Sequence, residues 1–534
     1  LEEELLTHGI KSIESTKGVR TAQTENSSFL ISIDKKADEY SGEVYAGALA
    51  WSGNYKLSFQ VSETGNLDIV VGMNPFASSF ILEPGEEIKT PEIIWSYSSI
   101  GKNRISQNFH NWSRRYALAH GNDLRPIVLN SWEGVYMNFD EKDILSLIDD
   151  AANFGVELFV LDDGWFGDKY PRDKADSGLG DWVVNKKKLP HGIGYLADYA
   201  VNKGVRFGIW IEPEMVNPKS ELFEKHPDWA ITLPNRETYY YRNQLVLDLS
   251  NPKVQDYVYG VVENIMKENP EVAFFKWDCN SPITNIYSPY LKNKQGQLYI
   301  DHVRGIYNVL KRVKANYPDV PMMLCSGGGA RCDYEALKYF TEFWCSDNTD
   351  PVERIYIQWG FSQFFPAKAM DAHVTSWNKA TSVKFRTDVA SMCKLGFDIG
   401  LKELTADELT YCQTAVANWK RLQSAIMDGD QYRLVSPYEG NHMALNYVSK
   451  DANKAVLFAY DIHPRFQEKL MTVKLQGLNP NKQYKVEEIN LMPSTESKLE
   501  SSGKVYSGDY LMKVGLNVFG FTATQSHVIE LTAQ

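Results

Sequence analysis

The middle of the chain, residues 125–428, alternates short apolar runs with amphipathic stretches of roughly 10 to 20 residues. This alternation predicts parallel strands joined by helical crossovers. We expect eight strands, at residues 126–130, 158–162, 206–211, 273–278, 322–325, 342–346, 369–374 and 396–399. Eight such units in about 300 residues predict a closed (β/α)8 barrel with long insertions after its second and third strands.

Short segments of alternating apolar and polar residues lie on both sides of this region and predict antiparallel β-domains. They cover residues 29–34, 45–51, 55–61, 67–71, 431–435, 442–447, 454–460, 469–474 and 528–531. We therefore expect an α/β chain in four parts: residues 1–103 as part of an N-terminal β-supersandwich, 104–124 as a helical connector, 125–428 as a TIM barrel, and 429–534 as an antiparallel C-terminal β-sandwich.

Charge and composition exclude several classes of partner. The net charge of −12 argues against nucleic-acid and anionic-membrane partners, which bind through clustered Lys and Arg. Apolar runs stay below the roughly 18 to 20 residues that cross a bilayer, so we expect a soluble protein. The chain begins at Leu1 rather than Met, which leaves open a cytoplasmic protein or one exported after removal of an N-terminal segment. The six cysteines form no CxxC pair, so we expect free thiols without a zinc site.

Residues at the carboxyl ends of barrel strands face the active-site end. The first six expected strands end in carboxylates, tryptophans and one glycine run, at Asn130-Ser131-Trp132-Glu133, Leu161-Asp162-Asp163-Gly164-Trp165, Trp210-Ile211-Glu212-Pro213-Glu214, Lys276-Trp277-Asp278-Cys279-Asn280, Cys325-Ser326-Gly327-Gly328-Gly329 and Trp344-Cys345-Ser346-Asp347. Neither a histidine cluster nor a phosphate-binding loop accompanies them. Paired carboxylates and aromatic surfaces are what sugar chemistry requires.

The end of the fourth strand carries the candidate nucleophile. Side chains two apart in a strand share a face, so Lys276, Asp278 and Asn280 point the same way. A cation beside a carboxylate lowers the pKa of that carboxylate and keeps it ionised near neutral pH, which suits a nucleophile. The alternative interpretation is a buried ion pair between Lys276 and Asp278 that closes the strand.

A second carboxylate is expected across the barrel mouth, because glycoside hydrolysis usually needs two. Asp347, at the end of the sixth strand, is the acid/base candidate, although it also fits an ordinary strand-end aspartate. Its rival Asp350 directly precedes Pro351, with Glu353 three residues further on. That arrangement favours a helix N-cap, so we assign Asp350 a structural role. Asp140 and Asn251 are further expected N-caps.

The acid pair, the tryptophans and the glycine run at the other strand ends can each be interpreted structurally or functionally. Asp162 and Asp163 fit a turn before a glycine, or two carboxylates that accept hydrogen bonds from neighbouring sugar hydroxyls. Trp132, Trp210 and Trp344 each fit a core residue, but three at strand ends favour a sugar-lined pocket. The run of three glycines lacks the GxGxxG spacing, which favours a role in letting a backbone N–H approach a ligand hydroxyl.

Six motifs in order resemble those of the α-galactosidases of glycoside hydrolase family 36: Leu161-Asp162-Asp163-Gly164-Trp165-Phe166-Gly167, Leu179-Gly180-Asp181-Trp182, Trp210-Ile211-Glu212-Pro213-Glu214-Met215-Val216, Arg242-Asn243-Gln244-Leu245-Val246-Leu247-Asp248, Lys276-Trp277-Asp278 and Ser346-Asp347-Asn348-Thr349-Asp350. The resemblance implies a retaining mechanism on terminal α-1,6-linked galactose, as in melibiose and raffinose. Asp278 would attack the anomeric carbon, and Asp347 would protonate the leaving oxygen and then activate water.

The same resemblance implies a set of sugar contacts. Asp162 and Asp163 would hold O4 and O6 of galactose, with Trp132 closing the wall at that end. Lys276 and Arg242 would bind ring hydroxyls, and Asn280 would lie near the 2-position. Cys325, Gly327 and Gly328 would contact O2. Trp344 and Trp210 would line the pocket and its mouth. The partner would be a galactosyl oligosaccharide. No metal or organic cofactor is implied, and a homo-oligomer is left open.

Two departures from the family pattern limit what the resemblance implies. Family members carry a longer N-terminal β-supersandwich, and Cys279 and Ser281-Pro282 replace the commoner Met and Arg, so the preferred oligosaccharide stays open. The alternatives are an α-N-acetylgalactosaminidase, a galactosyl-transferring relative, and a non-catalytic galactose-binding protein. The small corner at Cys325 and Gly327 makes little provision for an N-acetyl group, which favours galactose.

Overall fold

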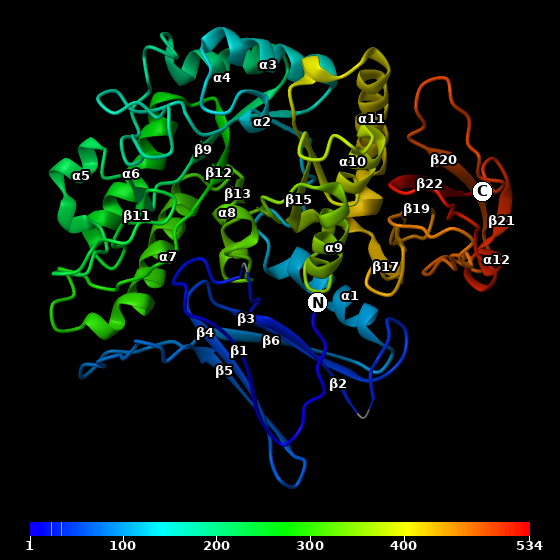
Figure 1. The fold of residues 1–534 in the computed structure, drawn as a ribbon, viewed down its shortest axis with the longest axis horizontal. Helices are drawn as coiled ribbons and strands as arrows, with labels where there is room; N and C mark the ends of the chain where they lie inside the picture. Colours follow the sequence, from blue (N-terminus) through cyan, green and yellow to red (C-terminus); the bar gives the residue numbers. More distant parts are fainter. Residues whose placement is uncertain (23, 34) are drawn as a thin grey trace.

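The computed structural model describes residues 1–22, 24–33 and 35–534. Figure 1 shows a barrel at the centre of the molecule, the N-terminal sheets below it, and the C-terminal sheet at one side. The predicted fold class, a TIM barrel flanked by antiparallel β-domains, is confirmed.

In the described part of the chain, eight parallel strands close into a barrel in the order β12-β13-β14-β15-β16-β7-β8-β9. They are β7 Val128–Asn130, β8 Leu158–Leu161, β9 Arg206–Ile211, β12 Val272–Trp277, β13 Met322–Leu324, β14 Glu342–Trp344, β15 Met370–Thr375 and β16 Lys394–Asp398. Each expected strand position holds a strand. The register closes where Gly396 of β16 lies opposite Val128 of β7. The strands are almost continuously apolar because a parallel barrel buries both of their faces.

Helices on the outside of the barrel return the chain from one strand to the next. The main ones are α3 Glu141–Phe154, α4 Gly192–Asn202, α6 Pro252–Glu268, α7 Leu298–Asn316, α9 Pro351–Phe361, α10 Val383–Ala390 and α11 Ala406–Asp428. Shorter elements in the segments that follow strands β7, β9 and β13 are α2 Trp132–Val135, β10 Met215–Val216, α5 Glu221–Lys225, β11 Leu245–Val246 and α8 Ser326–Gly329. The three predicted N-caps are confirmed. Asp140 forms a capping box with Asp143, Asn251 accepts from the Lys253 amide, and Asp350 accepts from the amides at the start of α9.

Two antiparallel sheets form the N-terminal domain, in the orders β1-β4-β5 and β2-β3-β6. Their strands are β1 Gly9–Ser15, β2 Ser28–Ser32, β3 Val44–Ala50, β4 Tyr55–Val61, β5 Leu67–Met73 and β6 Glu92–Ser98, and α1 Lys102–Tyr116 follows as the expected connector. The sequence analysis missed β1 and β6, whose side chains are mostly half-buried or exposed and show no clear alternation. Residue 34, the last of the first expected strand, lies outside the described residues.

The C-terminal sheet has the order β17-β18-β19-β22-β20-β21. Its strands are β17 Asp430–Val435, β18 His442–Val448, β19 Lys454–Asp461, β20 Gln483–Ile489, β21 Val505–Ser507 and β22 Gln525–Ala533, with α12 Gly508–Lys513 beside them. Alternate residues of β19 pack on opposite sides: Phe458 and Tyr460 join the core shared with the barrel, and Leu457 joins the separate core of this domain. The expected strand at 469–474 is wrong, because Val473 forms only an isolated bridge to Leu516.

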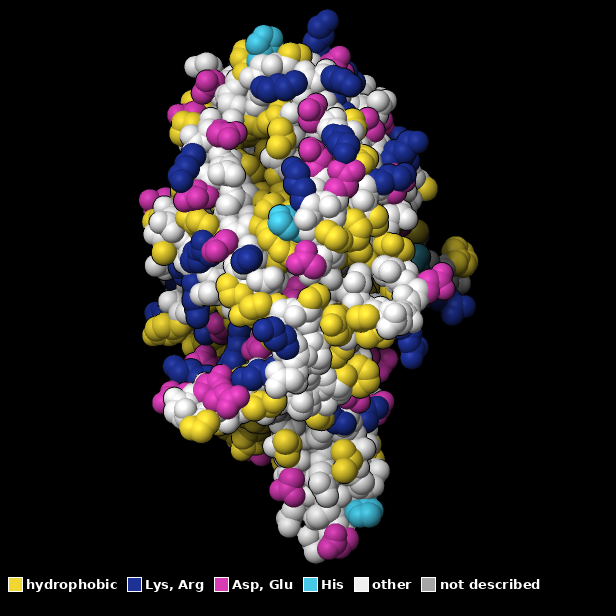
Figure 2. Space-filling view, turned by 90° about the vertical axis from the view of Figure 1, so that its left-hand side faces the viewer, with side chains coloured by type: hydrophobic (Ala, Val, Ile, Leu, Met, Phe, Trp, Pro, Cys, Tyr) yellow, Lys and Arg dark blue, Asp and Glu magenta, His cyan; other side chains and the backbone are white. Residues whose placement is uncertain are grey.

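Charges of both signs are mixed on the surface of the molecule. On the face shown in Figure 2, Lys and Arg side chains are interspersed with Asp and Glu side chains. Within the described ranges, none of the helices is both long and apolar enough to cross a membrane.

Candidate active site

The residues predicted to carry the chemistry lie at the carboxyl end of the barrel. Strand β12 ends at Trp277 and β14 ends at Trp344, so Asp278 and Asp347 stand in the loops just beyond their strands. Between these two loops lies the short helix α8, whose glycines Gly327 and Gly328 have positive φ of 58° and 79°. The structure therefore brings the two candidate carboxylates and the glycine run to one end of the fold.

Four hydrogen bonds hold the carboxylate of Asp278. Its Oδ1 accepts from the backbone amides of Cys279, at 2.8 Å, and Gly327, at 2.9 Å. Its Oδ2 accepts from Nδ2 of Asn280, at 2.7 Å, and from Nε1 of Trp210, at 3.3 Å. The residue is only 7% exposed, and these bonds fix the direction in which its carboxylate faces.

The carboxyl of Asp278 is held in its ionised form. Burial alone would raise its pKa, but the Gly327 amide, the positive charges of Arg242 and Lys276, and the Asn280 amide together lower the pKa below its ordinary value. The predicted effect of Lys276 is therefore present. It acts at a distance, however, because the hydrogen-bond partner of Lys276 is a different carboxylate.

Nζ of Lys276 lies 2.6 Å from Oδ2 of Asp162, and both side chains are buried. The same Asp162 oxygen accepts from Nδ2 of Asn130, at 2.8 Å. Asn130 also donates to Asp398, at 3.0 Å, which links strands β7, β8, β12 and β16 around the barrel axis. Neither Asn130 nor Asp398 was selected from the sequence.

The adjacent Asp163 faces a different partner. Nε and Nη2 of Arg172 donate to its carboxylate at 2.9 and 2.8 Å. Burial nevertheless raises the pKa of Asp163, and the charge of Arg172 opposes that rise. The paired hydrogen bonds from Arg172 to Asp163 are of the bidentate kind, in which an Arg binds a carboxylate strongly and in a fixed orientation. The DDG motif therefore presents Asp162 and Asp163 in fixed and different orientations. Sequence reasoning missed Arg172, which lies in an irregular insertion.

The pKa of Asp347 is shifted in the opposite direction from that of Asp278. Its side chain reaches solvent, yet the protein walls around the carboxyl and the negative charge of Asp278 raise its pKa. Nε1 of Trp344 donates to its Oδ1, at 3.0 Å. The Trp344 ring in turn contacts two neighbours: the centre of the His373 ring lies 4.4 Å from its own centre, and the guanidinium carbon of Arg354 also lies 4.4 Å from it.

Arg354, on helix α9, holds the loop that carries Asp347. Its buried guanidinium donates to the backbone carbonyls of Ser346, at 2.8 Å, and Asn348, at 3.0 Å, on either side of the acid. The loop is thus fixed from both sides of Asp347 as well as through Trp344.

The glycine run is required by close packing. A Cβ on Gly328 would lie 2.2 Å from the backbone nitrogen of Asp347, and one on Gly327 would lie 2.6 Å from Nη2 of Arg20. Cys325 is buried at the base of this run, in the barrel interior beside Trp344. The glycines therefore let three loops meet without side chains between them.

Asn280 connects the nucleophile candidate to a second group of residues. Its Oδ1 accepts from Nη1 of Arg242, at 2.5 Å, and its backbone amide donates to Oε1 of Glu212, at 2.7 Å. Glu212 is fully buried, and burial together with the charge of Asp278 raises its pKa to about 8. Gln244 donates to the other oxygen of Glu212, at 3.1 Å.

One contact comes from outside the barrel. Arg20, in the segment between β1 and β2, donates from Nη1 to the backbone carbonyl of Asn280, at 2.8 Å. Its guanidinium carbon lies 5.4 Å from the centre of the Tyr241 ring. The N-terminal domain therefore forms part of the wall around Asp278.

Trp132 lies at the first position of α2, half-buried and edge-on to Tyr136, with ring centres 5.3 Å apart. Across the described ranges, the search for groups of three or more His, Cys, Asp and Glu residues that could hold a metal ion finds none. The expected absence of a metal cofactor stays a prediction.

A parallel barrel with two carboxyl groups of opposite protonation tendency at its carboxyl end defines the class of a glycoside hydrolase. The family models agree. The model described as Melibiase matches residues 87–429, and those of the glycosyl hydrolase family 36 N-terminal and C-terminal domains match residues 1–83 and 442–531.

Relatives and solved structures support the same assignment. Alpha-galactosidase AgaA of Geobacillus stearothermophilus is 37% identical over 97% of this chain and 69% of its own length. Alpha-galactosidase Mel36A of Lactobacillus acidophilus is 34% identical over 96% of this chain and 69% of its own. A crystal structure of an AgaA variant in complex with raffinose superposes with a TM-score of 0.93, at 36% identity, over 99% of this chain and 72% of that one. The chain belongs to glycoside hydrolase family 36, so the resemblance seen in the sequence is confirmed.

Proposed function

We propose that the protein is a retaining exo-α-galactosidase that removes terminal α-linked galactose, mainly α-1,6-linked, from oligosaccharides such as melibiose and raffinose. The observation that carries the proposal is the contrast between two carboxyl groups at one barrel mouth. The environment of Asp278 lowers its pKa, as a nucleophile requires, and that of Asp347 raises its pKa, as an acid requires.

The reaction proceeds in two steps. The ionised carboxylate of Asp278 attacks the anomeric carbon, the glycosidic C–O bond breaks, and Asp347 gives its proton to the leaving oxygen. A galactosyl ester of Asp278 results. Asp347, now a carboxylate, takes a proton from water, whose oxygen attacks the anomeric carbon and breaks the ester bond. Galactose leaves with its α-configuration retained, and Asp347 is protonated again.

The other predicted site residues are proposed as sugar ligands. Asp162 and Asp163 would accept hydrogen bonds from O4 and O6, beside Trp132, and the fixed orientations of the two carboxylates support this role. Lys276, Arg242 and Asn280 would bind the ring hydroxyls and the 2-position, Cys325, Gly327 and Gly328 would border O2, and Trp210 and Trp344 would line the pocket.

Galactose rather than its N-acetylated analogue is supported by the packing beside the glycine run. Arg20 and Asn280 already lie within 2.6 and 3.0 Å of where a single Cβ on Gly327 would stand. A further acetamido group at that corner would meet the same atoms. The crystal structures of AgaA variants with raffinose and stachyose show that a close relative binds galactosyl oligosaccharides.

The test is replacement of the nucleophile. Asp278→Gly should lose almost all release of nitrophenol from nitrophenyl α-galactoside, and added azide should restore part of this release by displacing the nitrophenol to form β-galactosyl azide, with inversion at C1. Asp350→Asn is a matched control, because Asn also caps helices and this residue lies outside the proposed chemistry. Unchanged turnover in Asp278→Gly would remove Asp278 from the mechanism.

We also propose the division of the chain at residues 103, 124 and 428. The bounds of the elements support it to within a few residues, since α1 begins at Lys102, just before the first boundary, β7 begins at Val128 and β17 at Asp430.

A further inference from the structure

A small polar cavity lies among strand β15, helices α9 and α10 and the loop that precedes α9. It contains about 210 Å³ of space, part of which is open to solvent. His373 of β15 and Arg354 of α9 line it, and both contact the ring of Trp344, whose indole N–H donates to Asp347. Arg386 of α10 also lines it. The cavity therefore adjoins the residues that hold the proposed acid.

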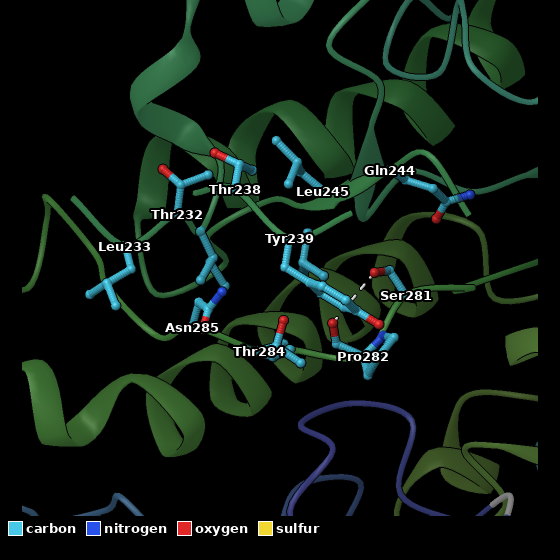
Figure 3. A pocket seen from close by; sticks show the side chains of 13 residues that line it. Thr232, Leu233, Thr238, Tyr239, Gln244, Leu245, Ser281, Pro282, Thr284 and Asn285 are labelled. Carbon is cyan, nitrogen blue, oxygen red and sulfur yellow. Dashed lines mark hydrogen bonds between the residues drawn. The ribbon is translucent and has the colours of Figure 1, made fainter. Parts of the chain in front are cut away.

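This cavity contains two positive charges and no carboxylate. Its lining includes Arg354 and Arg386 and, in the part of the chain that the structure describes, neither Asp nor Glu. The hollow shown in Figure 3, between residues 231–246 and 281–285, differs in this respect, because its described lining contains no Lys, Arg, Asp, Glu or His. An excess of positive charge thus distinguishes the cavity beside Trp344.

The two guanidiniums donate to neutral groups. Arg354 donates to three backbone carbonyls, at 2.8, 3.0 and 3.3 Å. Arg386 donates to the backbone carbonyl of Thr375, at 2.6 Å. Across the described ranges, neither side chain forms an ion pair with a carboxylate. Burial lowers the pKa of both, so the carboxylates further away only partly offset the cost of burying the two charges.

Three buried polar atoms of the lining residues have no hydrogen-bond partner within the described structure. They are Nε of Arg386, Nδ1 of His373 and Oε1 of Gln358, and His373 and Gln358 are only 5% and 3% exposed. Thr349 adds a hydroxyl whose oxygen accepts from Oγ1 of Thr375, at 2.8 Å, so its own proton is available to a ligand. Since buried polar groups are normally paired, these atoms point to a ligand in the cavity.

Size and charge together select the class of ligand. The interior has room for about one water-sized particle, which excludes a polyatomic anion such as sulfate. Two guanidiniums repel a cation, and a water molecule would leave both buried charges uncompensated. A monatomic anion meets these conditions. The one unpartnered acceptor, Oε1 of Gln358, is a neutral dipole, and two full positive charges outweigh it.

We propose that this cavity binds one small monovalent anion of the halide class, such as chloride, through Arg354 and Arg386. The bound anion fixes the Arg354 side chain and, through its hydrogen bonds to Ser346 and Asn348, the backbone on either side of Asp347. Binding of the anion is independent of the proposed function. Its effect on catalysis rests on that function, because it acts through the proposed acid.

Thermal unfolding tests the site without an assay of activity. At constant ionic strength and pH, replacing sodium isethionate by sodium chloride should raise Tm along a saturating curve, because the anion binds the folded state. Bromide should act in the same way, and its anomalous scattering in soaked crystals should place it at the guanidiniums of Arg354 and Arg386. A Tm that does not respond to chloride, or bromide bound only elsewhere, would rule out the site.

Two variants and a control assign the response to this cavity. Arg386→Gln should raise the chloride concentration at half-saturation about tenfold to a hundredfold, since it removes a charge-assisted contact. Thr349→Val, a milder change, should raise it about threefold. Arg304→Gln is the matched control, because Arg304 is also half-buried but lies on α7 and does not line the cavity. A wild-type midpoint in both Arg386→Gln and Thr349→Val would contradict the assignment.

An activity measurement tests the link to Asp347. Removing chloride should lower kcat/KM for raffinose about fivefold, and that for dinitrophenyl α-galactoside, whose leaving group needs little protonation, by less than about twofold. A saturating rise in Tm without any change in kcat/KM would contradict the link to catalysis and leave the binding site standing. Failure to hydrolyse nitrophenyl α-galactoside at any chloride concentration would contradict the proposed function instead.

Discussion

Arg20 of the N-terminal domain donates a 2.8 Å hydrogen bond to the backbone carbonyl of Asn280, whose side chain holds the carboxylate of Asp278. The Arg20 side chain is 4% exposed, and a Cβ on Gly327 would meet its guanidinium. A residue more than 250 positions away in the sequence thus contacts the segment that follows the candidate nucleophile.

Replacing Arg20 should slow the chemistry more than it weakens substrate binding. Arg20→Met should lower kcat for nitrophenyl α-galactoside by about tenfold to a hundredfold, since a hydrogen bond to a charged group contributes about 1.5–3 kcal/mol. Arg20→Lys should recover part of the loss. The exposed Arg115 offers a matched control, Arg115→Met, which should retain full activity. A change in KM alone would contradict the positioning role of Arg20.

Arg354→Met should release the loop that carries Asp347 from its two carbonyl contacts and from the stacking on Trp344. Because the proposed acid, Asp347, would protonate the leaving group, kcat/KM should fall about tenfold or more for natural sugars and far less for an activated dinitrophenyl α-galactoside. A series of aryl galactosides measures this dependence on the leaving group. If the losses prove equal across the series, Arg354 supports the fold rather than the acid.

The two proposed catalytic carboxyls predict a bell-shaped pH profile for kcat/KM. Asp278 acts when ionised and its pKa is lowered, so the acidic limb should lie below the ordinary 3.8 of an aspartate. Asp347 acts when protonated and its pKa is raised, so the alkaline limb should lie above 3.8. Asp347→Ala, assayed with the dinitrophenyl substrate, should lose the alkaline limb and keep the acidic one. An unchanged alkaline limb would assign that titration to another group.

Glu212 should make the stability of the protein depend on pH. Burial and the charge of Asp278 raise its pKa from 4.5 to about 8, so the folded state binds the proton more tightly than the unfolded state. The resulting stabilisation is complete below pH 4.5 and is lost as pH rises to about 8, by up to about 1.4 kcal/mol per pH unit.

Glu212→Gln, which cannot titrate, should therefore gain in free energy of unfolding relative to the wild type between these pH values, as followed by urea unfolding. Glu237→Gln, in an exposed loop, is the control and should show no such trend. A constant difference between wild type and Glu212→Gln across this range would show that Glu212 does not titrate there.

The fold was predictable wherever its determinants are local. Eight apolar runs predict the barrel, and Asp350 followed by Pro351 predicts a helix start, because capping depends on residues within one turn. The strands β1 and β6 were not predictable in the same way. Their side chains are mostly half-buried or exposed, and the contacts that make them strands come from distant partners such as β4 and β3.

The candidate site follows the same rule. Asp278, Asn280 and Lys276 stand at one strand end, so their proximity could be predicted from a period of two. Arg172 and Arg20 could not be found in this way, since each approaches the site from an irregular segment whose path depends on the tertiary structure. The partner of Lys276, Asp162, follows another strand, so this contact depends on how the strands are arranged in the barrel.

The side chains proposed to grip galactose already restrain one another, since Lys276 is paired with Asp162, Arg172 with Asp163 and Arg242 with Asn280. The conformational entropy of these side chains is therefore lost during folding. Binding of a sugar then restricts them little further, whereas immobilising a free side chain would cost about 0.5–1.5 kcal/mol. Affinity for galactose thus depends on how rigidly the barrel is folded, and substitutions that loosen the core far from the mouth will weaken recognition there.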